Sequence, residues 1–218
     1  MFDAAIFDWD GTLADSLRAI VVSFHNTLRE HGLDVSTEYI ERRVGIGASD
    51  TFRDILRSHN REVDEHIVSE LVARKSEIQV LLADEIKLFD GAIDLLVRLQ
   101  GKLRLVLASM NNRAVLAHLL KVKCLDGSFE FVITGDEVSR SKPDPEIFLR
   151  VATELNVDPG RCVVFEDSIF GIKAAKAAGM KCVAVTTGVY NQKELEVVKP
   201  DLVVETLSNP KIFSFILA

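Results

Sequence analysis

Short apolar segments that are typical of buried β-strands recur along the chain, and helical patterns separate them. The segments span residues 4–7, 103–108, 131–133, 162–165, 181–185 and 202–204. Their apolar residues run continuously instead of alternating with polar ones, as in strands that are covered on both faces. This strand–helix alternation predicts an α/β fold built on a doubly wound parallel sheet.

The first two strand segments are too far apart for a single simple connection. A β-α-β unit takes about 30 residues, whereas the first segment ends at Asp8 and the second at Ser109. Residues 16–82 show only helical patterns, with candidate N-caps at Ser16, Ser36, Ser49 and Asp64. We therefore expect a helical domain, residues 15–85, inserted into an α/β core formed by residues 1–14 and 86–218. Because ligands bind outside the carboxyl ends of parallel strands, this insertion should cover the site.

Composition narrows the range of partners. The chain has 218 residues, is 48% hydrophobic and carries a formal net charge of −7, which argues against binding to nucleic acid or to an anionic membrane. The cysteines Cys124, Cys162 and Cys182 lack the spacing of a metal site, so we interpret them as reduced residues in apolar segments. Without a membrane-length apolar stretch or a basic leader, the expected location is the cytoplasm.

The first strand segment ends at two carboxylates, Asp8 and Asp10, followed by Gly11 and Thr12. Asp8 is a candidate nucleophile, since a carboxylate can attack a phosphoryl group and form an aspartyl-phosphate. A turn at Gly11 could place Asp10 beside it as general acid and base. The same string is equally typical of an ordinary strand-to-helix turn with polar capping residues.

Two further strand ends carry groups that suit a phosphate. Ser109, Met110 and Asn111 lead into a helix, where a hydroxyl and free backbone N–H groups can bind an anion. The simpler interpretation is that Ser109 or Asn112 caps that helix. After the third strand, Lys142 could neutralise phosphate charge and keep Asp8 ionised, although most lysines are solvated surface residues.

The fourth strand segment ends at Glu166 and Asp167, which could bind Mg²⁺ or cap the next helix. Close pairs among four such acids would repel each other by several kcal/mol at an effective dielectric constant of about 20. A divalent cation and Lys142 would relieve this repulsion and would also attract a phosphate.

Together these motifs resemble the haloacid dehalogenase-like (HAD) hydrolase superfamily over essentially the whole chain. The similarity is strongest to members with a helical cap between the first two motifs, which include phosphoglycolate phosphatases and β-phosphoglucomutases. It implies a Rossmann-like core in which Asp8 is the nucleophile, Asp10 the general acid and base, and Ser109 the phosphate-binding hydroxyl. Lys142 matches the lysine of the family.

The resemblance also implies a Mg²⁺ site. Asp8 and Asp10 are metal ligands in the family, Asp10 through its backbone carbonyl. Glu166 and Asp167 match the acidic pair, in which Asp167 is expected to be the direct ligand.

Several relatives are disfavoured by single residues. Dehalogenases of the superfamily lack the second aspartate, whereas Asp10 is present. Phosphonoacetaldehyde hydrolases replace that aspartate by a small residue and use a cap lysine, but the insertion has no lysine before Lys75. β-Phosphoglucomutases have a histidine near the position of Ile20.

The substrate-facing loop of the insertion is expected around Arg43, Gly45, Gly47 and Ser49, where glycines let the backbone approach a ligand. Arg43 is as well explained as a solvated helix-end arginine. The predicted activity is Mg²⁺-dependent hydrolysis of a small phosphorylated metabolite, phosphoglycolate or a sugar phosphate, by a monomer or homodimer. The alternatives are a phosphomutase of the β-phosphoglucomutase type and a catalytically silent binding protein.

Overall fold

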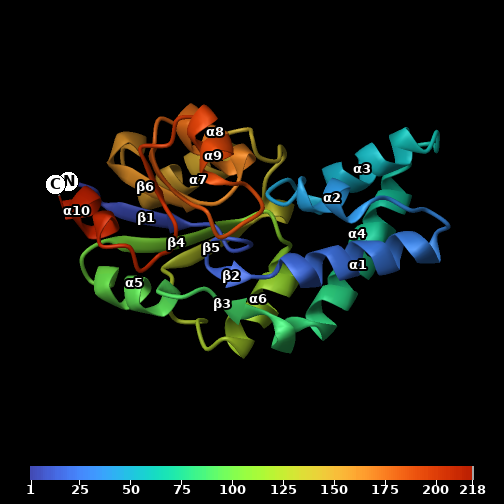
Figure 1. The fold of residues 1–218 in the computed structure, drawn as a ribbon, viewed down its shortest axis with the longest axis horizontal. Helices are drawn as coiled ribbons and strands as arrows, with labels where there is room; N and C mark the ends of the chain where they lie inside the picture. Colours follow the sequence, from blue (N-terminus) through green and yellow to red (C-terminus); the bar gives the residue numbers. More distant parts are fainter. Residues whose placement is uncertain (218) are drawn as a thin grey trace.

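The computed structural model describes residues 1–217, which form one six-stranded sheet with helices on both sides (Figure 1). The sheet strands are β1 (Ala4–Phe7), β4 (Arg104–Ser109), β5 (Phe131–Thr134), β6 (Cys162–Glu166), β7 (Lys181–Val185) and β8 (Leu202–Val204). They lie in the order β5-β4-β1-β6-β7-β8, and every neighbouring pair is parallel. The predicted doubly wound α/β fold is confirmed. β1 lies inside the sheet, so its carboxyl end is flanked by those of β4 and β6.

Both faces of the sheet are covered by apolar layers. Successive side chains of a strand point to opposite faces, so Ala4 and Ile6 enter one layer and Ala5 and Phe7 the other. The first layer includes side chains from α7 (Glu146–Leu155), α8 (Ile169–Ala177) and α9 (Gln192–Val197). The second includes side chains from α5 (Ala92–Leu99), α6 (Arg113–Val122) and α10 (Lys211–Leu217). This double coverage is the physical reason for the continuously apolar strand segments.

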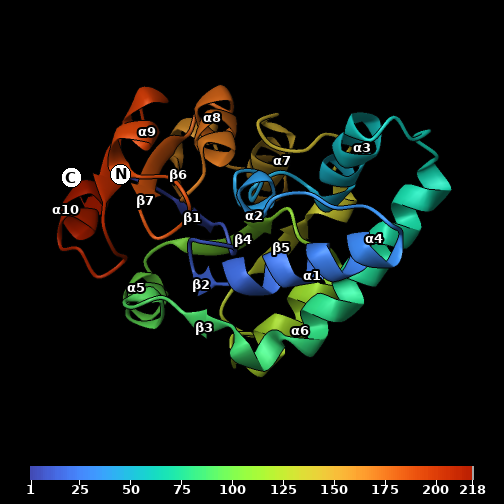
Figure 2. The same cartoon turned by 45° about the vertical axis from the view of Figure 1, so that its right-hand side comes forward.

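The remaining helices lie beyond the carboxyl end of β1 (Figures 1 and 2). They are α1 (Leu17–Glu30), α2 (Thr37–Glu41), α3 (Ala48–Ser58) and α4 (Glu65–Leu81). They share an apolar cluster of their own, which includes Ile20, Phe24, Leu28, Phe52 and Leu71. The two chain crossings between this cluster and the sheet pair with each other as β2 (Ala14–Asp15) and β3 (Lys87–Leu88). The predicted domain boundaries fall at this antiparallel pair and stay a prediction.

Short 3₁₀ helices complete the elements: η1 (Ala83–Glu85), η2 (Gly135–Glu137) and η3 (Pro159–Arg161). Of the four predicted N-caps, Ser36 and Asp64 accept hydrogen bonds from backbone N–H groups of their helices. The prediction for Ser49 is wrong, because Ser49 lies inside α3. Ser16 stands at the N-cap position of α1, as predicted, but its side chain makes no capping hydrogen bond, and its hydroxyl donates to a carboxylate of the site described below.

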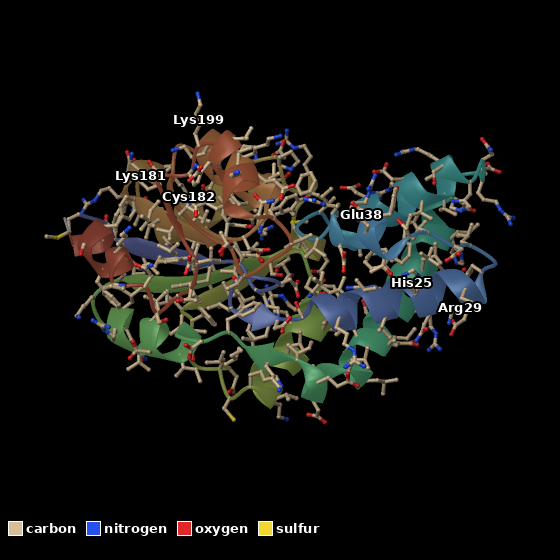
Figure 3. The ribbon with its side chains drawn as sticks, viewed as in Figure 1. His25, Arg29, Glu38, Lys181, Cys182 and Lys199 are labelled. Carbon is tan, nitrogen blue, oxygen red and sulfur yellow. The ribbon has the colours of Figure 1, made fainter. Side chains whose placement is uncertain are left out.

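The cysteines are unpaired. Cys162 and Cys182 are buried in strands, and Figure 3 shows Cys182 within the sheet. Cys124 follows α6 and is exposed, so the prediction of an apolar surrounding is wrong for this residue. Figure 3 also shows His25 and Arg29 on α1, well away from the sheet. None of the helices within residues 1–217 is both long and apolar enough to cross a membrane.

Candidate active site

A buried lysine links the carboxyl ends of β1 and β6. Lys142, in the loop before α7, is 1% exposed, and its Nζ lies 2.6 Å from Asp8 Oδ1 and 2.7 Å from Glu166 Oε1. Asp8 directly follows β1 and Glu166 ends β6, so the strand order brings the two carboxylates together. Lys142 also donates a hydrogen bond to the Ala108 carbonyl at 3.3 Å. The ammonium is therefore the counter-ion of two buried acids.

Asp8, Glu166 and Asp167 form a compact group of carboxylates. Each offers an oxygen within 4.8 Å of the others. A Cβ atom added at Gly188 would lie 1.8 Å from Asp167 Oδ2, and one added at Gly11 would lie 2.2 Å from it. These two glycines therefore leave space that a side chain would fill. An all-oxygen donor set of this charge fits a hard divalent cation such as Mg²⁺.

The three carboxylates differ in how far the protein already satisfies them. Oε1 of Glu166 accepts a hydrogen bond from Lys142, and Oε2 accepts hydrogen bonds from the backbone N–H groups of Asp167 and Ser168. Asp167 Oδ1 accepts a hydrogen bond from Thr12 Oγ1 at 2.9 Å. Within residues 1–217, Oδ2 of both Asp8 and Asp167 is without such a donor. Asp8 and Asp167 are thus better suited than Glu166 to bind a metal directly.

Burial dominates the electrostatics of the group. It raises the pKa of Asp8 to about 8, against the opposing charge of Lys142, while Glu166 and Asp10 increase it further. Burial, followed by the charges of Glu166 and Asp8, raises the pKa of Asp167 well above its ordinary value. Burial alone would lower the pKa of Lys142, but the two carboxylates that it binds raise it above its ordinary value. A further cation would stabilise the ionised form of these acids.

The side chain of Asp10 lies outside the carboxylate group. Its Oδ1 accepts a hydrogen bond from Ser16 Oγ at 2.5 Å, and its Oδ2 accepts one from Asn111 Nδ2 at 2.8 Å. Burial raises the pKa of Asp10, and the hydrogen bond from Ser16 and the charge of Lys75 oppose this increase. An acid with a raised pKa is suited to proton transfer near neutral pH. A metal contact of Asp10 would come through its backbone carbonyl, as the resemblance implies.

In the loop after β4, different residues cap α6 and line the cavity above Asp8. Ser109 is fully buried, and its Oγ accepts a hydrogen bond from the backbone N–H of Asn111 at 3.2 Å. Asn112, not Ser109, caps α6. Met110 and Asn111 line the cavity above Asp8. Two of the three residues predicted to bind phosphate thus share a cavity with the predicted nucleophile, and Ser109 ends β4, the strand that pairs with β1.

The predicted substrate loop of the insertion is divided between two cavities. Arg43 and Gly45 line a cavity of about 40 Å³ that also contains Asp8 and Asp10. Gly47 and Ser49 line a neighbouring cavity of about 160 Å³. Of these four predicted residues, only Arg43 and Gly45 thus share the cavity of the acids.

The glycines of this loop also serve a purpose that the sequence did not reveal. A Cβ at Gly45 would lie 2.6 Å from Ser168 Oγ, and a Cβ at Gly47 would lie 2.8 Å from Ser141 Oγ. Both neighbours belong to loops of the α/β core. The glycines therefore let the insertion approach the core, in addition to any ligand.

Sequence reasoning missed Lys75 as a site residue. It lies on α4, is 5% exposed and lines both cavities. Its Nζ donates a hydrogen bond to the side-chain carbonyl of Gln79, one helical turn further on. Burial lowers the pKa of Lys75 to about 8, with Asp10 opposing the decrease. The sequence did indicate that Lys75 would be buried, because it falls at helical spacing with the apolar residues Val68, Leu71 and Ile78.

Comparison with known proteins agrees with this geometry. Residues 5–185 match the family model of haloacid dehalogenase-like hydrolases. Validoxylamine A 7′-phosphate phosphatase of Streptomyces hygroscopicus subsp. limoneus is 32% identical, over 86% of this chain and 87% of its own. Fructose-1-phosphate phosphatase of Escherichia coli (strain K12) is 31% identical, over 83% of this chain and 94% of its own. The crystal structure of β-phosphoglucomutase from Clostridium difficile is 29% identical with a TM-score of 0.84, over 99% of this chain and 97% of that one. The chain therefore belongs to the haloacid dehalogenase-like hydrolases, as a phosphomonoester hydrolase of that family.

Proposed function

We propose that the protein is a Mg²⁺-dependent phosphatase that hydrolyses a small phosphorylated metabolite through an aspartyl-phosphate on Asp8. The observation that carries this proposal is the arrangement of Asp8, which lines the cavity while Lys142 holds only its Oδ1. Asp8 therefore keeps a carboxylate oxygen that no protein donor holds. Residues 15–85 act as a cap that closes over this atom.

The residues of the chain supply both chemical steps. Asp8 attacks the phosphorus as the bond to the leaving oxygen breaks, and Asp10 gives that oxygen a proton. Asp10 then removes a proton from a water that attacks the aspartyl-phosphate, which releases inorganic phosphate and restores Asp8. Ser16 and Asn111 position Asp10 for both transfers.

Charge is balanced by groups at three strand ends. Lys142 favours the ionised form of Asp8 and offsets the charge of Glu166. Ser109 and the backbone of the loop after β4, at Met110 and Asn111, bind the phosphoryl oxygens. Asp8, Asp167 and the backbone carbonyl of Asp10 hold Mg²⁺, and Glu166 orients this group. When bound, Mg²⁺ supplies the positive charge that stabilises the phosphoryl oxygens during transfer.

The substrate class is supported by the relatives. Their names specify phosphates of fructose and of validoxylamine A, and we extend this to a sugar phosphate or phosphoglycolate for this chain. The test is phosphate release by the purified protein from a panel of small phosphomonoesters with Mg²⁺. We expect turnover of at least one sugar phosphate or phosphoglycolate. Release from none of them would contradict the proposal.

A phosphomutase is the second candidate, because β-phosphoglucomutase is among the similar structures. Ile20, which lines the cavity, replaces the histidine of the mutases with an apolar side chain, and this favours hydrolysis. The two activities separate when the protein is given β-glucose 1-phosphate, Mg²⁺ and a trace of glucose 1,6-bisphosphate. Glucose 6-phosphate forming much faster than free phosphate would establish the mutase instead.

A further inference from the structure

The cavity above Asp8 has charges of opposite sign on its two sides. The core contributes Asp8 and Asp10, together with Met110 and Asn111. The insertion contributes Arg43 and Lys75, and no acid. Its other lining residues are Ile20, Phe24, Ile40, Val44, Gly45, Ile46, Ala48 and Thr51. The cavity thus has an acidic floor and a cationic, otherwise apolar, roof.

Neither roof cation has a carboxylate partner among residues 1–217. Lys75 binds the neutral amide of Gln79. Arg43 lies with its guanidinium 3.6 Å from the centre of the Tyr39 ring, and its Nε is buried without a hydrogen-bond acceptor. Other arginines of the insertion, Arg53 and Arg74, form salt bridges with glutamates. The two cations that line the cavity therefore have no ionic partner within the described residues.

A buried ammonium without a counter-ion is unfavourable, and the lowered pKa of Lys75 reflects that strain. Asp10 compensates it in part across the cavity, without a hydrogen bond between them. A substrate with a neutral leaving alcohol would leave Arg43 and Lys75 desolvated and without an ionic partner. A substrate with an anionic leaving alcohol would pair with both residues while its phosphoryl group lies at Asp8.

We propose that Arg43 and Lys75 bind a second anionic group of the substrate, so that the preferred substrate is a phosphomonoester whose leaving alcohol carries a carboxylate or a second phosphate. This inference rests on the proposed phosphatase function and narrows it. Arg43 is suited to hold two anionic oxygens at once, while Lys75 supplies a point charge deeper in the cavity.

The test compares matched pairs of phosphomonoesters that differ in one charge. The carboxylate arm uses 2-phosphoglycolate against ethylene glycol monophosphate, and 3-phosphoglycerate against glycerol 3-phosphate. The second-phosphate arm uses fructose 1,6-bisphosphate against fructose 1-phosphate. In one arm or both, we expect kcat/KM to be at least tenfold higher for the more anionic member.

Variants then assign the preference to residues. Lys75→Met and Arg43→Gln should each bring the ratio within a pair close to one, mainly by raising KM for the anionic member. Arg74→Met, which removes an exposed charge from the same helix as Lys75, should leave the ratio unchanged. If Lys75→Met fails to fold, Arg43→Gln, at a partly exposed position, still tests the proposal.

Two results would overturn the inference while the phosphatase function stands. The first is equal or higher kcat/KM for the neutral member of every pair. The second is an equal loss of kcat/KM for both members of a pair in Lys75→Met and Arg43→Gln, which would mean that the two cations act on Asp10 or on the transferred phosphoryl group. No phosphate release from any compound would remove the phosphatase proposal itself, and this inference with it.

Discussion

Replacing Lys142 by methionine removes the buried charge between Asp8 and Glu166 while keeping most of the side-chain volume. The ammonium lies 2.6 and 2.7 Å from the two carboxylates, and its side chain is fully buried. Removing one partner of a buried ion pair costs about 3–5 kcal/mol. Since about 2–4 °C of melting temperature corresponds to 1 kcal/mol for a chain of this size, we expect the variant to melt roughly 6–20 °C lower at neutral pH.

The sign of the pH dependence follows from the carboxylates. The pKa of an aspartate is near 4 in the unfolded chain, and burial raises that of Asp8 to about 8 in the fold, with Lys142 opposing the increase. Without Lys142 the pKa of Asp8 rises further, so folding takes up protons at neutral pH. Below about pH 8 Asp8 is protonated in both folded proteins, so its part of the extra destabilisation should appear as the pH rises through about 8. A higher pKa lowers the ionised fraction of Asp8 at neutral pH, so kcat should fall as well.

The measurements are thermal melts from pH 6 to 10 and phosphate release at saturating Mg²⁺. Lys176→Met is the matched control, because it removes a lysine that pairs with Asp201 at the surface, where an ion pair contributes about 0–1 kcal/mol. Adding Glu166→Gln to Lys142→Met should recover part of the stability without restoring turnover. Wild-type melting and turnover in Lys142→Met would refute the counter-ion role.

The remaining predictions concern the nucleophile, the metal and the roof of the cavity. Asp8→Asn should lower kcat by about 10³-fold or more while the protein stays folded, and near-normal phosphate release would exclude Asp8 as nucleophile. Mg²⁺ at about 100 times its Kd should add about 2.7 kcal/mol of stability, which is roughly 5–11 °C in a thermal melt, and Asp167→Asn should abolish this shift. A chelator should abolish turnover, and Ca²⁺ should support turnover poorly. Gly188→Ala places a Cβ 1.8 Å from Asp167 Oδ2, whereas Gly127→Ala meets no atom within 4 Å, so a calorimetric titration should show weaker Mg²⁺ binding only for the former. Lys75 loses its charge as the pH rises through about 8. Above that pH, the KM for phosphoglycolate should therefore increase more than the KM for ethylene glycol monophosphate. An equal increase in KM for both compounds would contradict this prediction.

Much of the core site could be predicted from local patterns. Continuous apolar segments can be buried only in a sheet covered on both faces, and in a parallel sheet their carboxyl ends share one edge. Asp8, Ser109, Lys142 and Glu166 follow or end such segments, so their proximity was predictable without coordinates. Ser16 stands at the N-cap position of α1 as predicted, but local patterns did not show that its hydroxyl donates to Asp10, which comes within reach only after the chain turns.

The sequence by itself determined the fold class, the acidic strand ends and the helical nature of the insertion, because each depends on residues that are close along the chain. The tertiary structure alone decided which residues of the insertion meet the acids. Lys75 lies on α4 and Arg43 in the turn after α2, and they share a cavity with Asp8 only because α2 and α4 pack over the carboxyl end of β1. Gly45 and Gly47 are likewise explained by Ser168 and Ser141, which are distant in sequence. Periodicity specifies which face of a helix is buried, but the partner of that face depends on long-range packing.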